Sequence, residues 1–347
     1  MNLRFAIGNL RLMLAFTALL LSGWIVTGCV SKNKLTAVKP GQRLDRRGDE
    51  IMVCGQLFHT GAPVILWTDP GGYDAYRTER RFAPMTQASY AETTRQVKDI
   101  TSPNRYSLRQ SVLTTQQAEQ VRGGGWPLEL LQQKVDQFVI HYDVCGTAAQ
   151  CFFILHDYRD LSVHFMLDVD GTIYQTLDLK ERAWHATTAN SRSVGVEIAN
   201  IGAYPLGTRD DPLDQWYRHD DTGKRRLVLP ISVRKGNLPP NLVVRPMRDD
   251  PIVGEVQGQK MRMYDLTPQQ YDSLTRLTAT LCKVFPKLKC DYPRDEDGKL
   301  ITHQLTKAQL DQYEGVLGHF HVDNKKTDPG PAFQWDLVID GARKLMK

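Results

Sequence analysis

Alternating apolar and polar positions mark the middle of the chain and predict β-strands there. The segments KVDQFVIHYD (134–143) and SVGVEIANI (193–201) are short runs rich in β-branched or aromatic residues, a composition that favours strands. Between them, DLSVHFMLDVDGTIYQTLD (160–178) contains two alternating stretches joined by Asp170 and Gly171, a dipeptide typical of tight hairpin turns. The apolar run CFFILHDY precedes this hairpin. We therefore expect several strands of one sheet in this part of the chain.

Near residue 270 the apolar period lengthens from two to between three and four, which predicts a helix. Thr267 is in position to cap its start, with Pro268 as the first helical residue and Gln270 closing a capping box. Because strands and helices are interleaved, we predict an α/β domain with a mixed central β-sheet flanked by helices. The apolar face of the predicted helix carries Tyr271, Leu274, Leu277, Leu281 and Phe285.

Two regions have a different pattern. Residues 51–125 begin with alternating positions interrupted by turn signals and end in Gly123–Gly125, which predicts a small β-containing accessory region with a hinge. Residues 203–262 are rich in proline, aspartate and arginine, and we expect an insertion with its own strands, such as RRLVLPISV. Neither region contains a recognisable chemical motif.

Residues 1–28 have the composition of an export signal. Arg4 and Arg11 precede an apolar run that is shorter than the roughly 20 residues of a membrane-spanning helix. An uncleaved anchor helix is the alternative. The end of this segment, VTGC, is similar to the lipobox of bacterial lipoproteins, in which the cysteine is acylated and becomes the first mature residue. The resemblance implies Cys29 as a lipid anchor. The polar and basic composition of the following segment predicts a tether over residues 29–50.

A lipid anchor would place the exported chain on the periplasmic side of a bacterial membrane. No aspartate follows the lipobox cysteine, which favours the outer membrane where the cell has one. Oxidising compartments allow disulfides, and the close spacings predict two short-loop pairs, Cys145–Cys151 and Cys282–Cys290. Buried free thiols are the alternative, and Cys54 is left over.

Composition and charge exclude several classes of protein. With 41% hydrophobic and 24% charged residues over 347 positions, the chain is not collagen-like, disordered or a multispanning membrane protein. Its 44 lysines and arginines against 39 acidic residues give a net charge of +5. Because these charges are interleaved and no dense basic block occurs, we expect no nucleic-acid partner.

Four polar residues suggest a metal site. His141 lies in FVIHY and Glu197 in VGVEIAN, while His319 and Asp328 follow in LGHFHVDNKKTDPGPAF. Two imidazoles and one carboxylate can hold a catalytic zinc ion and leave a fourth position for water or substrate. Water bound to zinc ionises near neutral pH. The carboxylate of Glu197 would be held on a rigid strand among apolar neighbours.

Five segments in this order resemble the zinc-dependent N-acetylmuramoyl-L-alanine amidases of the type-2 amidase and peptidoglycan recognition protein superfamily. They are FVIHY, SVHFMLDVDGTIYQ, ERAWHA, SVGVEIAN and GHFHVDNKKTDPGPAF. The resemblance covers residues 135–204 and 264–336 and is absent from residues 30–125 and from the insertion. It implies an amidase domain over residues 126–347, a Zn2+ cofactor and a peptidoglycan or muropeptide substrate.

The resemblance also implies a role for each matching residue. His141, His319 and Asp328 match the family's metal ligands. Lys326 matches a lysine that stabilises the oxyanion, and Glu197 matches an acidic residue that acts as general base or orients the water. These roles agree with amide hydrolysis, which needs an activated water, a base and a cation near the carbonyl oxygen.

The sequence departs from the family pattern in two places. Asp328 follows His319 by nine positions where relatives often have ten, which leaves His321 as an alternative ligand. Val163 stands where some members have a tyrosine, so a tyrosine-assisted mechanism is not available and the role of Glu197 gains weight.

Two further histidines and one cysteine pair belong to the matching region. His164 and His185 are expected to line the groove and contact the muropeptide, with simple packing as the alternative. The spacing of Cys145 and Cys151 resembles that of a disulfide in the animal recognition proteins. The resemblance therefore supports the first predicted disulfide.

The sequence thus predicts a lipid-anchored zinc hydrolase that cleaves the amide bond between N-acetylmuramic acid and L-alanine. One alternative is a peptidoglycan-binding module without catalysis, which the complete set of ligands disfavours. Another is a zinc peptidase acting on stem-peptide bonds, because the metal chemistry is the same for any amide.

Overall fold

The computed structural model describes residues 40–77 and 105–347 of the chain. It divides the chain into two compact units, Met1–Asp45 and Arg46–Lys347, and all elements described below belong to the second. The predicted signal segment and Cys29 lie outside the described residues. Within the described ranges, no helix combines the length and the apolar character needed to cross a membrane.

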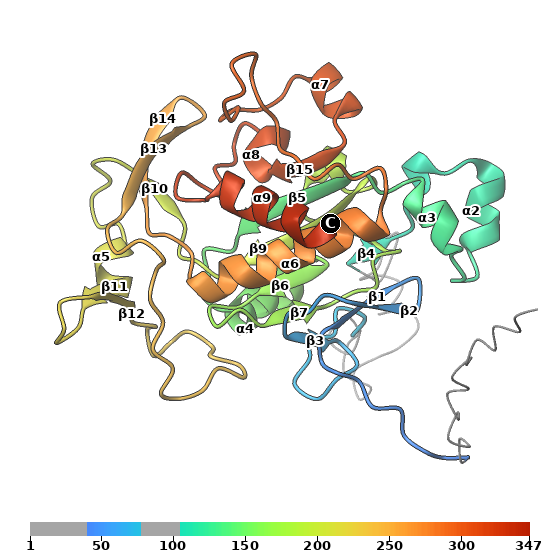
Figure 1. The fold of residues 1–347 in the computed structure, drawn as a ribbon, viewed down its shortest axis with the longest axis horizontal. Coiled ribbons are helices and arrows are strands. Elements are labelled where there is room, and N and C mark those ends of the chain that lie inside the picture. Colours follow the sequence, from blue (N-terminus) through green and yellow to red (C-terminus); the bar gives the residue numbers. More distant parts are fainter. Residues whose placement is uncertain (1–39, 78–104) are drawn as a thin grey trace, which may run out of the picture. The chain divides into compact units, whose positions relative to one another are not determined.

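A six-stranded sheet forms the centre of the second unit (Figure 1). Neighbouring strands run parallel, except that β6 (Phe165–Leu167) and β7 (Ile173–Gln175) form an antiparallel hairpin. The mixed central sheet predicted from the sequence is therefore confirmed. In spatial order the strands are β15 (Gly315–Gly318), β5 (Gln137–Tyr142), β9 (Ser193–Ile198), β6 (Phe165–Leu167), β7 (Ile173–Gln175) and β3 (Val64–Leu66).

The β6–β7 hairpin turns at the predicted Asp170–Gly171 pair. Gly171 has a φ of +87°, a left-handed conformation that glycine adopts without steric cost. Its backbone N–H donates to the carbonyl of Asp168 at 3.0 Å, and the Asp168 N–H donates to the carbonyl of Thr172 at 2.9 Å. These two bonds close the turn and fix the register of β6, the strand that lies beside β9.

Strand β3, which belongs to the predicted accessory region 51–125, contributes directly to this sheet. The hairpin of β1 (Glu50–Val53) and β2 (Gln56–His59) leads into β3, which pairs in parallel with β7 and forms an edge of the sheet. Ile51 is fully buried in the main apolar core. The later described elements are β4 (Tyr106–Ser107), which pairs with β8 (Arg182–Ala183), the 3-10 turn η1 (Gln110–Val112), α2 (Thr115–Val121) and α3 (Leu128–Gln132).

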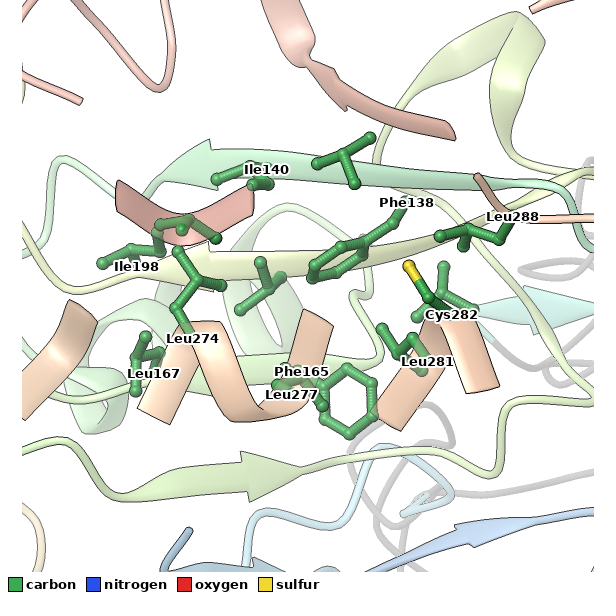
Figure 2. Close-up of a cluster of buried hydrophobic side chains, with 14 of the residues drawn as sticks. Phe138, Ile140, Phe165, Leu167, Ile198, Leu274, Leu277, Leu281, Cys282 and Leu288 are labelled. Carbon is green, nitrogen blue, oxygen red and sulfur yellow. The ribbon is translucent and has the colours of Figure 1, made fainter. Parts of the chain in front are cut away.

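Helices α6 (Pro268–Val284) and α9 (Trp335–Met346) pack against each other and cover one face of the sheet (Figure 1). The predicted capping box is present, because Gln270 N–H donates to Thr267 Oγ1 at 3.0 Å and Thr267 N–H donates to Gln270 Oε1 at 2.9 Å. Figure 2 shows the apolar side of α6 against the strands. The side chains that meet there include Phe138, Ile140, Phe165, Leu167, Leu274, Leu277 and Leu281.

The opposite face of the sheet is covered by α4 (Ala148–Phe152) and the π-helix η2 (Phe153–Tyr158). Met166 packs in the apolar cluster of α4, whereas its neighbours on β6 point into the core beside α6. The apolar run CFFILHDY is therefore helical. The face that α4 shares with the ends of β5 and β9 carries the candidate site.

The predicted insertion has its own strands. β14 (Gln259–Met263) pairs with β10 (Ala203–Pro205) on one side and with β13 (Ile252–Val256) on the other. β11 (Tyr217–His219) pairs with β12 (Arg225–Leu227), the only part of RRLVLPISV that is a strand. The remaining helices are η3 (Thr187–Ala189), α5 (Leu213–Trp216), α7 (Lys307–Gln312) and α8 (His319–Val322).

Candidate metal centre and active site

Strand register brings His141 and Glu197 together. β5 and β9 run parallel with His141 opposite Glu197, and Glu197 in turn lies opposite Met166 of β6. Residues at opposed positions point to the same side of a sheet, so these side chains lie on the face that α4 covers. Ile140 and Ile198 point the other way, into the core beside α6 (Figure 2). One pair of strands thus supplies both the core and two site residues.

His141, His319 and Asp328 bring three donor atoms into a small triangle. His141 Nδ1 is 2.9 Å from His319 Nδ1 and 2.9 Å from Asp328 Oδ2, and His319 Nδ1 is 3.0 Å from the same oxygen. All three side chains are buried. A tetrahedral ion with bonds of about 2.0–2.1 Å sets its ligand atoms roughly 3.3 Å apart. The triangle therefore fits one small cation after shifts of a few tenths of an ångström.

The protonation of this triangle also favours a cation. Asp328 can accept a hydrogen bond from Nδ1–H of each imidazole, but two protonated Nδ1 atoms would then face each other at 2.9 Å. His319 Nε2 is buried without a hydrogen-bond partner among the described residues. A divalent cation bound by the two unprotonated nitrogens and the carboxylate removes the conflict between the N–H groups.

Local sequence holds His319 and Asp328 in place. β15 ends at Gly318 and α8 begins at His319. A side chain at Gly318 would bring its Cβ within 2.7 Å of Pro329, so glycine allows the two chain segments to approach. The backbone N–H of Phe320 donates to the carbonyl of Asp328 at 3.1 Å. The nine-residue step in the sequence is therefore closed by direct contacts between its ends.

A residue of the insertion also holds this loop. Gln257 Nε2 lies 2.9 Å from the carbonyl oxygen of Phe320, 3.2 Å from that of Asp323 and 3.3 Å from that of Lys326. Its side-chain oxygen accepts a hydrogen bond from Gln304 N–H at 3.1 Å. Gln257 was not predicted from the sequence as a site residue. No local signal could have found it, because its partners are distant in the sequence.

His321, the alternative ligand, uses both of its ring nitrogens elsewhere. Its Nδ1 accepts the backbone N–H of Gly318 at 2.9 Å, and its Nε2 donates to the carbonyl of Ile301 at 2.7 Å. Both nitrogens therefore have protein partners. His319 is the histidine that completes the candidate metal cluster.

Burial and mutual contacts give His141 and Asp328 the protonation states that a metal site needs. Burial, followed by the neighbouring His319, lowers the pKa of His141 to about 4. Burial alone would raise the pKa of Asp328, but His319 and His141 lower it below its ordinary value. At neutral pH the imidazole of His141 is therefore neutral and the carboxyl group of Asp328 is ionised. These forms bind metal ions.

Glu197 presents a carboxyl group without a partner beside this cluster. Its Oε2 is buried and accepts no hydrogen bond within the described part of the chain. Burial, followed by the charge of Asp328, raises the pKa of Glu197 well above its usual value. A carboxylate whose ionised form is poorly stabilised is a better base near neutral pH.

A cavity of about 150 Å³ opens beside the cluster, and Glu197 and Lys326 line it together with the three candidate ligands. Lys326 is half-buried, whereas Lys325 next to it is exposed. Lys326 is therefore the lysine of this pair that faces the cavity. The wall also includes Tyr142, Ile154, Leu155 and Trp184.

The structure places the two remaining motif histidines behind the candidate ligands. His185 borders the cavity, but its Nδ1 lies 3.0 Å from His141 Nε2. His164 is fully buried, and its ring nitrogens lie 3.1 Å from the Gly195 N–H nitrogen and 3.0 Å from the Glu181 carbonyl oxygen. His164 therefore has no free surface for the expected substrate contact. Its environment fits the alternative given above, in which His164 packs in the interior.

The five described cysteines are thiols. The sulfur atoms of Cys145 and Cys151 lie within 4.8 Å of each other, and the neighbouring thiol of Cys290, followed by burial, raises the pKa of Cys282. Each predicted pair is therefore adjacent in space, and the two disulfides stay predictions. Burial raises the pKa of Cys54, the unpaired cysteine, to about 12.

A mixed sheet with a buried histidine–histidine–carboxylate cluster at one face defines a candidate metallohydrolase. Residues 131–331 match the N-acetylmuramoyl-L-alanine amidase family. This range covers more than half of the chain and contains all three candidate ligands, Glu197 and Lys326. The chain therefore belongs to this family.

Among curated proteins, the chain is similar to a peptidoglycan-recognition protein of Drosophila melanogaster, at 29% identity over 126 residues. The corresponding protein of Drosophila simulans is 28% identical over 123 residues. The two matches cover 33% and 32% of this chain and 64% and 62% of those proteins. The chain thus spans less than two thirds of the length of these relatives.

Among solved structures, the chain is similar to the amidase AmiD from E. coli, solved with anhydro-N-acetylmuramic acid-L-Ala-D-gamma-Glu-L-Lys. The identity is 16% and the TM-score 0.33, over 63% of this chain and 59% of that chain. It is also similar to a selenomethionine derivative of AmpD, at 16% identity and a TM-score of 0.31, over 70% of this chain and 90% of that chain.

Proposed function

We propose that the protein is a zinc-dependent hydrolase that cleaves the amide bond between N-acetylmuramic acid and L-alanine in peptidoglycan or muropeptides. The observation that carries this proposal is the buried triangle of His141, His319 and Asp328 beside the unpartnered carboxyl group of Glu197. Membership of the amidase family supports the type of bond.

The set of donor atoms supports zinc as the metal. Two imidazole nitrogens and one carboxylate oxygen form a ligand set that zinc takes in catalytic sites, with a fourth position open. When bound, the ion supplies a Lewis acid for the carbonyl oxygen and lowers the pKa of water to about 7. The cavity borders His141, His319 and Asp328, so water and substrate can reach the open position.

Glu197 is proposed as the general base. It lies on the same face of the sheet as His141, on the neighbouring strand, and it borders the cavity. Its unpartnered Oε2 is free to accept a proton from the attacking water. The same carboxyl group can then donate this proton to the nitrogen of the leaving L-alanine.

Lys326 is proposed to stabilise the oxyanion. Negative charge grows on the carbonyl oxygen of the scissile amide as water attacks, and a fixed cation lowers the energy of that state. Lys326 borders the cavity, and Gln257 holds the carbonyl of this residue. The backbone of Lys326 is thereby fixed relative to the loop that carries Asp328.

The substrate is proposed from family membership and from the walls of the cavity. The family is described by the bond between N-acetylmuramic acid and L-alanine, and we infer a substrate that contains this sugar and a peptide. Trp184 gives the cavity an aromatic wall, and Lys326 and Arg159 give it cationic groups. Such a lining suits a sugar joined to a short peptide with free carboxylates.

The cellular location is proposed from the sequence alone. The signal segment and the lipobox-like VTGC support export and lipid anchoring at Cys29, which would bring the enzyme to the periplasmic side of a bacterial membrane. An oxidising compartment would allow Cys145–Cys151 and Cys282–Cys290 to form disulfides. Mass spectrometry after non-reducing digestion tests both pairs, and four free thiols would overturn this part.

The proposed activity is tested on purified peptidoglycan with the chain from Val30 onward. We expect zinc-loaded protein to release soluble peptides, a chelator to abolish the release and added zinc to restore it. Lys325→Met, next to Lys326 but exposed, serves as a control that keeps activity. No peptide release by zinc-loaded protein would contradict the proposal.

A further inference from the structure

We propose that Arg109 is a positioning residue that fixes the series of contacts from His164 through His185 to His141, and thereby directs Nδ1 of His141 toward the metal. Arg109 lies outside the residues 131–331 that match the amidase family. It belongs to the region for which the sequence suggested no chemistry. The inference rests on the metal site proposed above.

Arg109 inserts a cation into the interior of the protein. Its side chain is fully buried, and within the described ranges it contacts carbonyl oxygens and no carboxylate at ion-pair distance. Burying an arginine in this way is costly unless its N–H groups are satisfied. The carbonyl acceptors, at 2.9–3.3 Å, are those of Leu179, Lys180, Asn190, Ser191 and Ser193.

These acceptors lie at the two ends of the segment that carries His185. Leu179 and Lys180 precede that histidine, and Asn190, Ser191 and Ser193 follow it. One guanidinium therefore holds both ends of the segment together. If the Arg109 side chain were moved or shortened, the two ends would no longer be held together. His185, which lies between them, would then no longer be held in place.

Arg109 also contacts His164, whose tautomer the structure determines. His164 Nδ1 accepts the backbone N–H of Gly195 at 3.1 Å, so this nitrogen carries no proton. His164 Nε2 lies 3.0 Å from the carbonyl oxygen of Glu181, which can only accept, so the proton is on Nε2. Arg109 Nη2 lies 3.2 Å from the same nitrogen, but both atoms carry protons, so this is a packing contact and Nη2 donates to the carbonyl of Leu179. Burial, followed by the charge of Arg109, lowers the pKa of His164 to about 3.

The fixed ring of His164 forms one wall of the space for His185. The two rings meet edge to face, with centroids 5.7 Å apart and an interplanar angle of 80°. Gly195 forms another wall, because a Cβ there would lie 2.5 Å from the His185 ring. The hydroxyl of Ser193, whose carbonyl accepts from Arg109, lies 3.2 Å from His185 Nε2. His185 therefore has little freedom to rotate.

The last contact in the series sets the orientation of the candidate ligand. His185 Nδ1 lies 3.0 Å from His141 Nε2. If His185 donates from Nε2 to Ser193, its Nδ1 accepts a hydrogen bond from Nε2–H of His141. Nδ1 of His141 is then unprotonated, and it is the atom that faces His319 and Asp328. Such partners behind a ligand fix its tautomer and orientation.

The test compares the zinc affinity of Arg109→Met with that of Arg192→Met as a matched control. Arg192 also donates to backbone carbonyls and pairs with Asp136, but it contacts none of the three histidines of the series. We expect Arg109→Met to weaken zinc binding by about 10- to 100-fold, the range for partners behind a ligand. Arg109→Lys should bind zinc more tightly than Arg109→Met but less tightly than the unaltered protein. Arg192→Met should leave the zinc affinity unchanged. Equal zinc affinities in the two methionine variants would overturn the proposal.

A second measurement uses the unaltered protein, in case Arg109→Met does not fold. Long-range 1H–15N spectra of the histidine-labelled chain should show His164 as the neutral Nε2–H tautomer at every pH from about 5 to 8. A protonated or Nδ1–H form of His164 in that range would overturn the proposal. Zinc affinity and the tautomer of His164 are both measured without amide cleavage. The role of Arg109 can therefore be overturned while the proposed activity is confirmed, and the proposed activity can be overturned while the role of Arg109 is confirmed.

Discussion

At the scale of single residues, the candidate chemistry depends on which buried groups carry protons. The pKa values of His141 and Asp328 are both lowered, so both side chains are in metal-binding forms at neutral pH. Glu197, which borders the same cavity, has a raised pKa. The surroundings thus lower the pKa values of these two candidate ligands and raise the pKa of the proposed base, which gives the groups different chemical roles.

Replacing Asp328 by asparagine should remove the metal. The change keeps the size of the side chain but removes the charge that faces His141 and His319. We expect zinc affinity to fall by more than about 100-fold, beyond the range for outer partners, as measured by zinc content after dialysis. Asp340→Asn, at an exposed position of α9, should retain full zinc content. A fully loaded Asp328→Asn protein would contradict the assignment of this ligand.

Replacing Glu197 by glutamine should abolish catalysis but leave zinc bound. General bases contribute about 10²- to 10⁴-fold, so we expect a loss of that order in kcat/KM. Because the base must be ionised and its pKa is raised, the rate of the unaltered enzyme should fall as pH decreases through that raised pKa. The pH profile of Glu197→Gln should lack this acid limb. An unchanged profile would assign the limb to another group.

The residue chemistry was predictable where it lies in compact motifs. His141, Glu197, His319, Lys326 and Asp328 each stand in a recognisable segment, and the structure brings them to one cavity. The position of His164 was not predictable, because a sequence does not show which ring nitrogens are already occupied. Arg109 and Gln257 act on segments far away in the chain, and neither stands in a motif.

At the scale of elements, local signals and tertiary contacts contributed differently. The start of α6 was predictable because Thr267, Pro268 and Gln270 satisfy the first turn by themselves. The run CFFILHDY is helical, although its apolar composition alone fits a strand as well as a helix. Strand β3 was not predictable as part of the central sheet, because its partner β7 is more than a hundred residues away.

The cap of α6 offers a test at this scale. Thr267→Ala removes the acceptor for Gln270 N–H and a hydrogen bond to the carbonyl of Val169. We expect the free energy of unfolding to fall by about 1–2 kcal/mol, as measured by urea denaturation, with zinc affinity unchanged. Thr267→Ser keeps the hydroxyl and should lose much less. Equal losses in both variants would mean that the cap does not stabilise the helix.

At the scale of the whole molecule, the central sheet separates packing from chemistry. One face holds the apolar core with α6 and α9, and the other carries the candidate ligands and the cavity. β5 contributes to both, through Ile140 on one side and His141 on the other. The ligands come from β5, from the start of α8 and from the loop after it. Metal binding should therefore join segments that are distant in the sequence.

This arrangement predicts that zinc stabilises the folded protein. A ligand that binds only the native state adds about 2.7 kcal/mol at a free concentration of 100 times its Kd. We expect zinc to raise the Tm in calorimetry and a chelator to reverse the shift. Asp328→Asn should show no zinc-dependent shift. A shift of the same size in that variant would indicate that the stabilising zinc binds elsewhere.

The bond that the protein cleaves is identified by the masses of the products that zinc-loaded protein forms from N-acetylmuramoyl-L-alanyl-D-glutamyl-lysine. We expect two products, N-acetylmuramic acid and the intact tripeptide with a free amino group on L-alanine. Products in which the sugar keeps its alanine would contradict the proposed activity, because the enzyme would then cleave a stem-peptide bond. An unchanged substrate with fully loaded zinc would contradict it as well.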